Sequence, residues 1–300
     1  MDKLSIVVCC HKKDPAVRTG YPYVPVHAGK ALHPDLDLGF AGDDTGDNIS
    51  LKNPQWCELT SLYWAWKNLP GTTYFGLAHY RRYLDVDTGD AAVDSLMADC
   101  DIVVSKGLCC SNSLAVGLMY LCNREDFWIF ADTLVSMHPD AGDTVIDYFF
   151  NSNYLYPCSV FLCRRELMEE YCGFIMPVLE ETEKRLLSSG YSRQCRAIAY
   201  MAEFMLGFYI AYRKLRVKEA DLCYTDEGKP VSGHRTFKSA FGRKVFFTLE
   251  RWMKNAYFRC FCKVRRDSFI VADEDVIRWL ANDGIRLRVL DRPLYYSRRV

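Results

Sequence analysis

The segment 74–84 begins as an apolar strand and continues into a cluster of basic residues. Its last residues bring together one imidazole and two guanidiniums, from His79, Arg81 and Arg82, and two aromatic residues, Tyr80 and Tyr83, alternate with them. In an open α/β sheet, ligands bind outside the carboxyl ends of the strands. Guanidiniums match phosphate oxygens in a bidentate manner. The interleaved aromatics favour a lined pocket for a phosphorylated ligand over a solvated strand end with surface arginines.

A second group of polar residues lies in the glycine-bearing turn 41–48, where Asp43, Asp44, Asp47 and Asn48 follow one another closely. Such carboxylates can hold a divalent cation or hydrogen-bond a ribose. Asx turns alone would also explain a sequence rich in Asp and Gly. The sequence leaves both interpretations open. Just beyond this turn, Asn53 is predicted to cap a helix that has Pro54 at its first position.

Two further carboxylates, Asp85 and Asp87, follow the basic cluster directly. An acid-x-acid pair at a strand end can hold a divalent cation, Mg²⁺ or Mn²⁺, against a diphosphate. The adjacent basic cluster could instead neutralise a diphosphate without metal. The motif is short and the chain contains 38 acidic residues, so the sequence does not decide between these alternatives.

One carboxylate, Glu203, lies in the most apolar part of a predicted helix, within the sequence Ala199–Leu206. A buried carboxylate is costly unless it is paired or functional. Burial raises a carboxyl pKa, which suits a general base that works near neutrality. The alternatives are a helix face turned to solvent, or a structural pair with Arg193 or Arg196.

Strands and helices alternate along the chain. Apolar runs bounded by turn residues predict strands at Leu4–Cys10, from Tyr74 to His79, at Asp101–Ser105, at Tyr156–Cys163 and at Arg216–Cys223. Helical spacing predicts helices from Asn53 to Pro70, at Glu166–Leu187 and at Arg193–Lys214, with 111–150 irregular or helical. This alternation predicts an α/β sheet covered on both faces. Turn residues at 226–230 favour a division into residues 1–226 and residues 227–300.

Composition narrows the class of protein. The 300 residues are half hydrophobic and carry a formal net charge of zero, so overall charge indicates no partner. The first apolar run is too short for a signal-peptide core, and no segment approaches the ~18 apolar residues of a spanning helix. The cysteines lack paired C-x-x-C spacing, which favours reduced core thiols. We therefore expect a soluble, cytoplasmic chain.

Charge is unevenly distributed, and residues 237–266 hold nine Lys or Arg against one acid, Glu250, with eight aromatics among them. Val245, Leu249, Trp252, Met253 and Ala256 share one helical face. A basic amphipathic helix with Trp and Phe is typical of an element that lies on an anionic membrane surface. The alternative is a helix packed on the rest of the protein. Nucleic acid is a poorer fit, because the rest of the chain offers no continuous basic surface.

Several blocks together resemble a bacterial domain family that was long of unknown function and is found in capsular and exopolysaccharide gene clusters. The blocks are Asp47–Ser50, Cys57–Thr60, Tyr63–Asn68 and Gly76–Tyr83, with Tyr23–Gly29 near the start and Phe161–Leu167 further on. The resemblance covers about residues 4 to 225. The family includes galactofuranosyltransferases. The chain departs from the pattern around 111–153, where acceptor recognition is least defined.

The resemblance implies a GT-A-like mixed sheet flanked by helices, with the basic helical segment as a C-terminal appendage. It implies a hexosyltransferase that moves a sugar from a nucleotide-sugar donor to a lipid-linked or growing polysaccharide acceptor. In that activity His79, Arg81 and Arg82 would neutralise the departing diphosphate, and Glu203 would be the base of an inverting transfer, with Asp44 in reserve. The residues that would hold the nucleotide are His11, Lys12, Asp47, Asn48, Asn53, Glu58 and Tyr80. Peripheral attachment to the inner face of the cell membrane would bring the enzyme to a lipid-linked acceptor.

Two other activities use the same residues. A catalytically silent, membrane-docked scaffold of a polysaccharide assembly complex would bind the nucleotide sugar without turnover. A nucleotide hydrolase would use the phosphate site without an acceptor pocket. Release of nucleoside diphosphate separates the three: it is absent for the scaffold, acceptor-independent for the hydrolase and acceptor-dependent for the transferase.

Overall fold

The computed structural model describes residues 2–187, 194–226, 229–230 and 240–262, together with 278, 280–282, 284 and 286. The chain forms two compact units, each assembled from segments that are distant in sequence. Unit 1 contains Met1–Gly107, Tyr156–Gly173 and Lys214–Thr236, and unit 2 contains Leu108–Leu155, Phe174–Arg213 and Phe237–Val300. These units do not follow a linear cut at residue 226, because unit 2 joins the C-terminal segment to segments from the middle of the chain.

Unit 1 is built on a mixed sheet with the strand order β10-β6-β9-β4-β1-β2-β3. The strands of this path are β1 (Leu4–Cys10), β2 (Tyr23–His27), β3 (Ala41–Gly42), β4 (Tyr74–His79), β6 (Ile102–Ser105), β9 (Phe161–Arg164) and β10 (Val217–Ala220). β9 runs antiparallel to both of its neighbours, whereas the other adjacent pairs are parallel. β5 (Arg82–Leu84) pairs with β4 and with β11 (Leu222–Asp226), which pairs with β12 (Lys229–Pro230).

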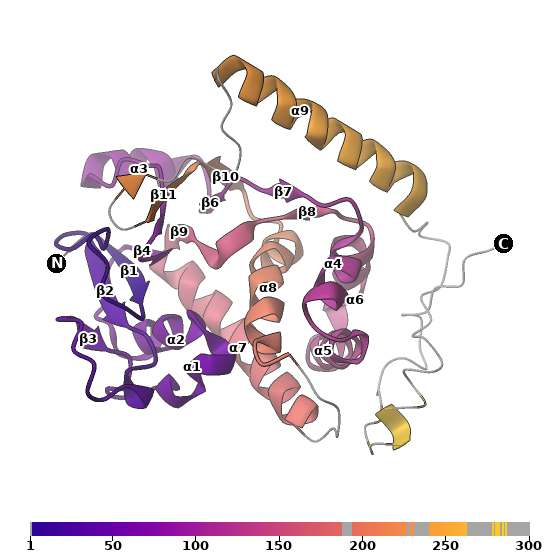
Figure 1. Cartoon of the computed structure of the whole chain (residues 1–300), viewed down its shortest axis with the longest axis horizontal. Helices are drawn as coiled ribbons and strands as arrows, with labels where there is room; N and C mark the ends of the chain where they lie inside the picture. The colour runs from indigo at the N-terminus through magenta and orange to yellow at the C-terminus, as the bar shows by residue number, and fades with distance from the viewer. Residues whose placement is uncertain are drawn as a thin grey trace. The chain divides into compact units, whose positions relative to one another are not determined.

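Helices cover both faces of this sheet (Figure 1). The first strand is buried along its whole length, as its continuous apolar sequence predicts. On one face, alternate residues of β1 pack in a core that includes Val93 and Met97 of α3 (Asp90–Ala98). On the other face, the Cys9 thiol contacts the carbonyl of Glu58, which directly precedes α2 (Leu59–Asn68). The mixed α/β sheet flanked by helices is therefore confirmed.

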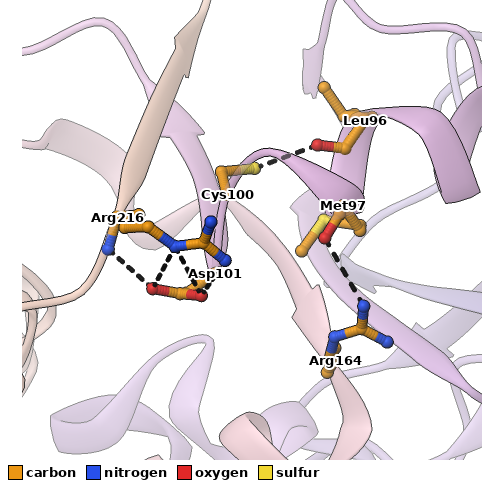
Figure 2. A network of polar contacts seen from close by, with 6 residues as sticks. All are labelled: Leu96, Met97, Cys100, Asp101, Arg164 and Arg216. Atoms are coloured by element: carbon orange, nitrogen blue, oxygen red, sulfur yellow. Dashed lines mark hydrogen bonds and ion pairs between the residues drawn. The ribbon is translucent and has the colours of Figure 1, made fainter.

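An ion pair ties the edge of the sheet together at the amino ends of β6 and β10 (Figure 2). The Asp101 carboxylate accepts hydrogen bonds from the Arg216 side chain, with Nη2 2.8 Å from Oδ1, and from its backbone N–H at 2.8 Å. Arg164, at the end of β9, donates to the Met97 carbonyl at 3.5 Å. The Arg216 contact holds the pKa of Asp101 below its ordinary value.

The predicted helix from Asn53 to Pro70 is interrupted. α1 (Asn53–Trp56) ends at Cys57, whose φ of 48° breaks the helix before α2 begins. Asn53 is not the cap that the sequence predicts. It is the first residue of α1, and its side-chain amide donates to the Cys57 carbonyl and to Thr60 Oγ1.

Two predicted strands also differ from the structure. Residues 156–160 of the predicted strand precede β9, and Pro157–Ser159 form a 3-10 turn with positive φ at Cys158 and Ser159. The predicted closing strand divides into β10 and β11 at Asp221. Further 3-10 turns lie at Lys30–Leu32, Ser50–Lys52 and Pro139–Ala141.

Unit 2 is mainly helical. It contains α4 (Leu114–Leu121), α5 (Arg124–Met137), α6 (Gly142–Val145), α8 (Ala197–Arg213) and the later part of α7 (Arg165–Leu187), with a π-helical turn at Ile146–Phe150. Phe127, Phe130, Phe149 and Phe208 are fully buried and form its aromatic core. The buried Asp132 carboxylate pairs with Arg185 at 2.7 Å. The segment 111–150, predicted as irregular or helical, is thus largely helical.

The remaining elements of unit 2 are the short pair β7 (Leu108–Cys109) and β8 (Tyr154–Leu155), and α9 (Ala240–Tyr257), followed by a π-helical turn at Phe258–Cys262. α9 is the helix predicted from the basic amphipathic sequence. Within the described residues, no helix has the length and apolar character needed to cross a membrane.

Candidate functional site

The candidate site lies in unit 1, at the carboxyl ends of β1 and β4. These strands are adjacent and parallel, with Cys9 opposite His79. From β1 the chain passes to β2 and β3 on one side and later returns to β4 on the other. The order of the strands therefore reverses between β1 and β4, which is the place where open α/β sheets bind ligands. Because both strands end at the same edge, residues 11–12 and 80–81 emerge together.

Tyr80 is the centre of this group. Its ring is 4% exposed and meets the His11 imidazole edge to face, with centroids 5.1 Å apart. The Lys12 Nζ lies 5.8 Å from the ring centroid and the Arg81 Cζ 4.9 Å from it. A tyrosine ring attracts cations over its face, so it can hold these groups near one another. The Tyr80 N–H donates to the Cys9 carbonyl at 3.1 Å, which fixes the ring at the junction of the two strands.

Within the part of the chain that the structure describes, the buried Tyr80 hydroxyl has no hydrogen-bond partner, and neither does the buried Ser159 hydroxyl. Buried polar groups are ordinarily satisfied, so each exception needs a physical reason.

His79 lies between two acceptors. Its Nε2 is 3.0 Å from the Cys158 carbonyl oxygen and 3.9 Å from Glu58 Oε1. The shorter contact assigns the proton to Nε2, which donates to the Cys158 carbonyl. Both side chains are largely covered, with 18% of His79 and 17% of Glu58 exposed. The Cys158 carbonyl thus orients the imidazole, and the Glu58 carboxylate lies beside it.

The Cys158 carbonyl, which His79 contacts, belongs to a segment with unusual backbone angles. Cys158 and Ser159 have φ of 74° and 49°, a left-handed region that non-glycine residues rarely adopt. The preceding carbonyl, of Pro157, accepts a hydrogen bond of 2.8 Å from the buried Ser105 hydroxyl. Strained backbone of this kind is common at functional sites. Nothing in the sequence indicates it, because the left-handed turn contains no glycine.

Arg82 lies beside this turn as the first residue of β5, paired with His79 on one side and with Tyr224 on the other. Burial raises the pKa of the Tyr224 phenol, and the nearby Arg82 guanidinium opposes that rise. The cationic groups of the sequence cluster are thus divided: Arg81 lies over Tyr80, and Arg82 lies near Tyr224.

The acidic turn lies at the carboxyl end of β3, on the same edge of the sheet. Asp43 is fully buried and accepts hydrogen bonds from the N–H groups of Gly29 and Lys30 and from the Ser50 hydroxyl. This carboxylate joins the end of β3 to the end of β2, so its role is structural. Asp44 is exposed and directly follows it.

Three other predicted nucleotide-binding residues use their side chains to hold loops. The Asp47 carboxylate accepts from the Tyr63 hydroxyl at 3.1 Å. The Asn48 amide donates to the carbonyls of Asp44 and Gly46, and its oxygen accepts from the Ser50 N–H. Asn53 closes the break between α1 and α2, as described above. Direct contact of these three side chains with a nucleotide stays a prediction.

The two candidate metal ligands diverge in what they contact. The Asp87 carboxylate accepts from the Gly89 N–H at 2.9 Å, in an Asx turn that leads into α3. Asp85 lies beside Cys223, whose pKa is raised by burial and by this carboxylate. Within the described residues, no three His, Cys, Asp or Glu side chains gather as a metal site. Asp85 and Asp87 thus have different surroundings, and a divalent cation at this pair stays a prediction to which we assign no step.

The predicted base, Glu203, belongs to unit 2. It lies near the middle of α8, half-buried between the buried residues Ala202 and Phe204. The sequence left open whether this side chain is buried or faces solvent, and the structure shows it partly covered.

The buried His27, at the carboxyl end of β2, is a further polar residue at this edge of the sheet. It is 1% exposed, and its Nε2 has no hydrogen-bond partner within the described residues. Burial lowers the pKa of His27 and so favours its neutral form. It pairs with Cys10 and Gly42, so it occupies the edge of the sheet between His11 and the acidic turn. The only signal in the sequence was its place in the block Tyr23–Gly29.

The profile of a family described as a domain of unknown function, DUF4422, matches residues 5–214. The chain belongs to the DUF4422 family. The matched region of this DUF4422 protein runs from β1 to the end of α8 and includes all the candidate residues above, whereas α9 lies outside it. No curated protein shows significant similarity to the chain.

The fold of this DUF4422 protein is similar to that of a solved structure, the apo form of the bifunctional glycosyltransferase WbbM. The TM-score is 0.67 and the sequence identity 24%, and the match covers 80% of this chain and 48% of the WbbM chain. The chain thus corresponds to about half of that protein. At this identity the likeness is one of fold.

Proposed function

We propose that this protein is a glycosyltransferase that uses a nucleotide-sugar donor and adds its sugar to a lipid-linked or growing polysaccharide acceptor. One observation carries the proposal. At the point where the strand order of the sheet reverses, His11, Lys12 and Arg81 surround the ring of Tyr80, beside the His79–Glu58 pair. A concentration of cationic donors at this position suits a diphosphate.

The chemistry needs few protein groups. The acceptor hydroxyl attacks the anomeric carbon, the bond from that carbon to the diphosphate oxygen breaks, and the nucleoside diphosphate leaves with the bonding electrons. His79, Arg81 and Arg82 are the groups that we assign to the charge that develops on the leaving diphosphate. His11 and Lys12 are assigned to the nucleotide, with Glu58 as the residue that lies beside His79 and helps to orient it.

The proton of the acceptor hydroxyl needs a base. Glu203 is our first candidate, as the base of a single inverting displacement, and the exposed Asp44 is the reserve. The proposal also includes finer details. We expect a GT-A-like fold, a hexose as the transferred sugar and a galactofuranosyl donor as one candidate. The fold likeness to WbbM supports the reaction class, since WbbM is a bifunctional glycosyltransferase.

The test begins with binding. The purified chain is screened by thermal shift against a panel of nucleotide sugars, and donors that stabilise it are used to measure nucleoside diphosphate release with and without a saccharide acceptor. We expect release that depends on the acceptor. Acceptor-independent release would identify a hydrolase, and binding without any release would identify a scaffold. If no nucleotide sugar stabilised the protein, the proposed donor site would be contradicted.

The variant that tests the site directly is His79→Ala, with Lys184→Ala as the matched control. Lys184 is a surface cation on α7 whose side chain is 73% exposed. The proposal expects His79→Ala to lose donor-dependent stabilisation and the control to keep it.

A further inference from the structure

The long helix α9 turns its apolar residues to solvent. Val245, Leu249, Trp252 and Met253 are 40%, 55%, 68% and 63% exposed, and they recur at the four- and three-residue spacing of one helical face. Ala256 continues the same face. We call these five residues the α9 stripe. A stripe of this kind ordinarily covers a core, and contiguous exposed apolar side chains instead mark a surface for interaction.

The opposite face of α9 contacts the rest of unit 2. The Asn153 amide, buried beside β8, donates to the Asn255 side-chain oxygen at 3.1 Å, and the Arg251 guanidinium lies 5.0 Å from the centre of the Tyr154 ring. Phe258, just past the helix, is 4% exposed. Figure 1 shows α9 running alongside β7. Because polar contacts fix the helix on its polar side, its apolar stripe is held outward.

The charge of α9 indicates what covers the stripe. Residues 240–262 carry five basic side chains, Arg243, Lys244, Arg251, Lys254 and Arg259, against the single acid Glu250. A helix with an apolar stripe, a basic polar face and an exposed tryptophan lies in the plane of a lipid interface, with the stripe among the acyl chains and the basic groups among the headgroups. A second copy of the chain fits less well, since pairing through the stripe would bring two positively charged helices together.

We infer that the α9 stripe is the surface by which this protein lies on an anionic lipid bilayer. The inference does not depend on the donor site, which is in unit 1, and it concerns a helix outside the region that matches the DUF4422 family. A transferase whose acceptor is lipid-linked would be brought to its substrate by such a surface. Lipid binding and sugar transfer can nevertheless succeed or fail separately.

The experiment uses the full chain and sedimentation with phosphatidylcholine vesicles, with and without phosphatidylglycerol. We expect binding to the anionic vesicles that weakens as salt rises, because surface charges are screened. The double variant Trp252→Ser/Met253→Ser should lower the partition coefficient by about a hundredfold, since two large side chains no longer enter the apolar layer. The control is Tyr120→Ser, which removes an 82% exposed aromatic from α4 of the same unit and should bind as the wild type does.

A depth measurement completes the test. Vesicles with brominated acyl chains should quench the fluorescence of the bound wild type, and Trp252→Phe should keep the binding but lose most of this quenching. The inference is overturned if the intact protein ignores phosphatidylglycerol vesicles or if the double variant binds as tightly as the wild type. It is also overturned if light scattering shows a dimer that the double variant dissociates, because a second copy would then cover the stripe. Circular dichroism confirms that each variant folds.

Discussion

The rings of His11 and Tyr80 meet edge to face at 5.1 Å, and this contact joins the end of β1 to the end of β4. These residues are far apart in sequence, and the parallel pairing of the two strands brings them together. Tyr80 thus organises the cations around it through its ring, while its buried hydroxyl bonds to nothing in the described part of the chain.

Removing the Tyr80 hydroxyl should have opposite effects on the stability of the fold and on ligand binding. Tyr80→Phe should leave the free energy of unfolding unchanged or raise it by up to about 1 kcal/mol, because an unsatisfied buried group is lost. The same variant should weaken nucleoside diphosphate binding by about 0.5–1.5 kcal/mol, the net value of one hydrogen bond. Urea unfolding and calorimetric titration measure the two effects.

Tyr83→Phe is the matched control. The Tyr83 hydroxyl is buried, donates to the Tyr80 carbonyl at 3.2 Å and accepts from the Arg18 N–H at 3.1 Å. Its removal should cost about 1–2 kcal/mol of unfolding free energy. If Tyr80→Phe lost as much stability as Tyr83→Phe, the Tyr80 hydroxyl would have an internal role.

The ion pair between Asp101 and Arg216 predicts a pH effect. The folded-state pKa of Asp101 is lowered, chiefly by the hydrogen bonds from Arg216. The unfolded chain therefore takes up this proton first as pH falls, so the stabilisation is fully present above about pH 4 and is lost below it. We expect Asp101→Asn to be less stable than the wild type at about pH 6, with the difference shrinking toward about pH 3. Urea midpoints measured across this range test it, with Asp99→Asn as the nearby control. A difference that stayed constant with pH would mean that the charge of Asp101 contributes nothing.

In the acidic turn, we expect adjacent residues to have different roles: Asp43 stabilises the fold and Asp44 is a candidate base. Asp43→Ala removes the acceptor of three hydrogen bonds at a fully buried position and should lower the unfolding free energy by about 3 kcal/mol or more. Asp44→Ala changes an exposed side chain and should alter stability by less than about 0.5 kcal/mol. Chemical denaturation measures both. Equal stability of the two variants would contradict the structural role of Asp43. A loss of turnover in Asp44→Ala would make Asp44 the base.

The sheet could be predicted because its central strands are continuous apolar runs. β1 has the bounds that Leu4–Cys10 predicted, and the rule for strand ends led from the sequence to His79 and Arg81. The end of α2 was predicted at Pro70, because proline cannot continue a helix. Local sequence is sufficient where burial on both faces and strand pairing agree with it.

The features that could not be predicted depend on long-range contacts. Cys57 and Cys158 have positive φ angles although neither residue is a glycine, so the sequence gives no sign of them. The break before α2 and the contact of His79 with the Cys158 carbonyl were therefore not predicted. A division at residue 226 reflects local turn chemistry. The compact units instead depend on pairing of β10 with β6 and of β11 with β5, across more than a hundred residues.

Glu203 was selected from its apolar surroundings together with the family resemblance, and its role is tested by kinetics. Glu203→Gln keeps the shape of the side chain but removes the base, so turnover should fall by roughly 10²-fold or more while donor binding is nearly unchanged. Initial rates of acceptor-dependent release, together with donor titration, measure the two quantities. Normal turnover would move the base elsewhere, with Asp44 next. A variant that unfolds would favour a structural role on α8.

The two arginines of the basic cluster provide the most direct test of the donor site. Arg81→Ala and Arg82→Ala should each weaken nucleoside diphosphate binding by about 1.5–3 kcal/mol, the scale of a hydrogen bond to a charged group. Arg81→Lys should recover only part of the affinity, because an ammonium cannot form the paired hydrogen bonds of a guanidinium. Lys184→Ala, a surface cation on α7, should bind as the wild type does. Calorimetric titration gives the affinities, and circular dichroism shows whether the fold survives, as we expect. If both alanine variants kept the wild-type affinity, the cluster after β4 would not be the diphosphate site.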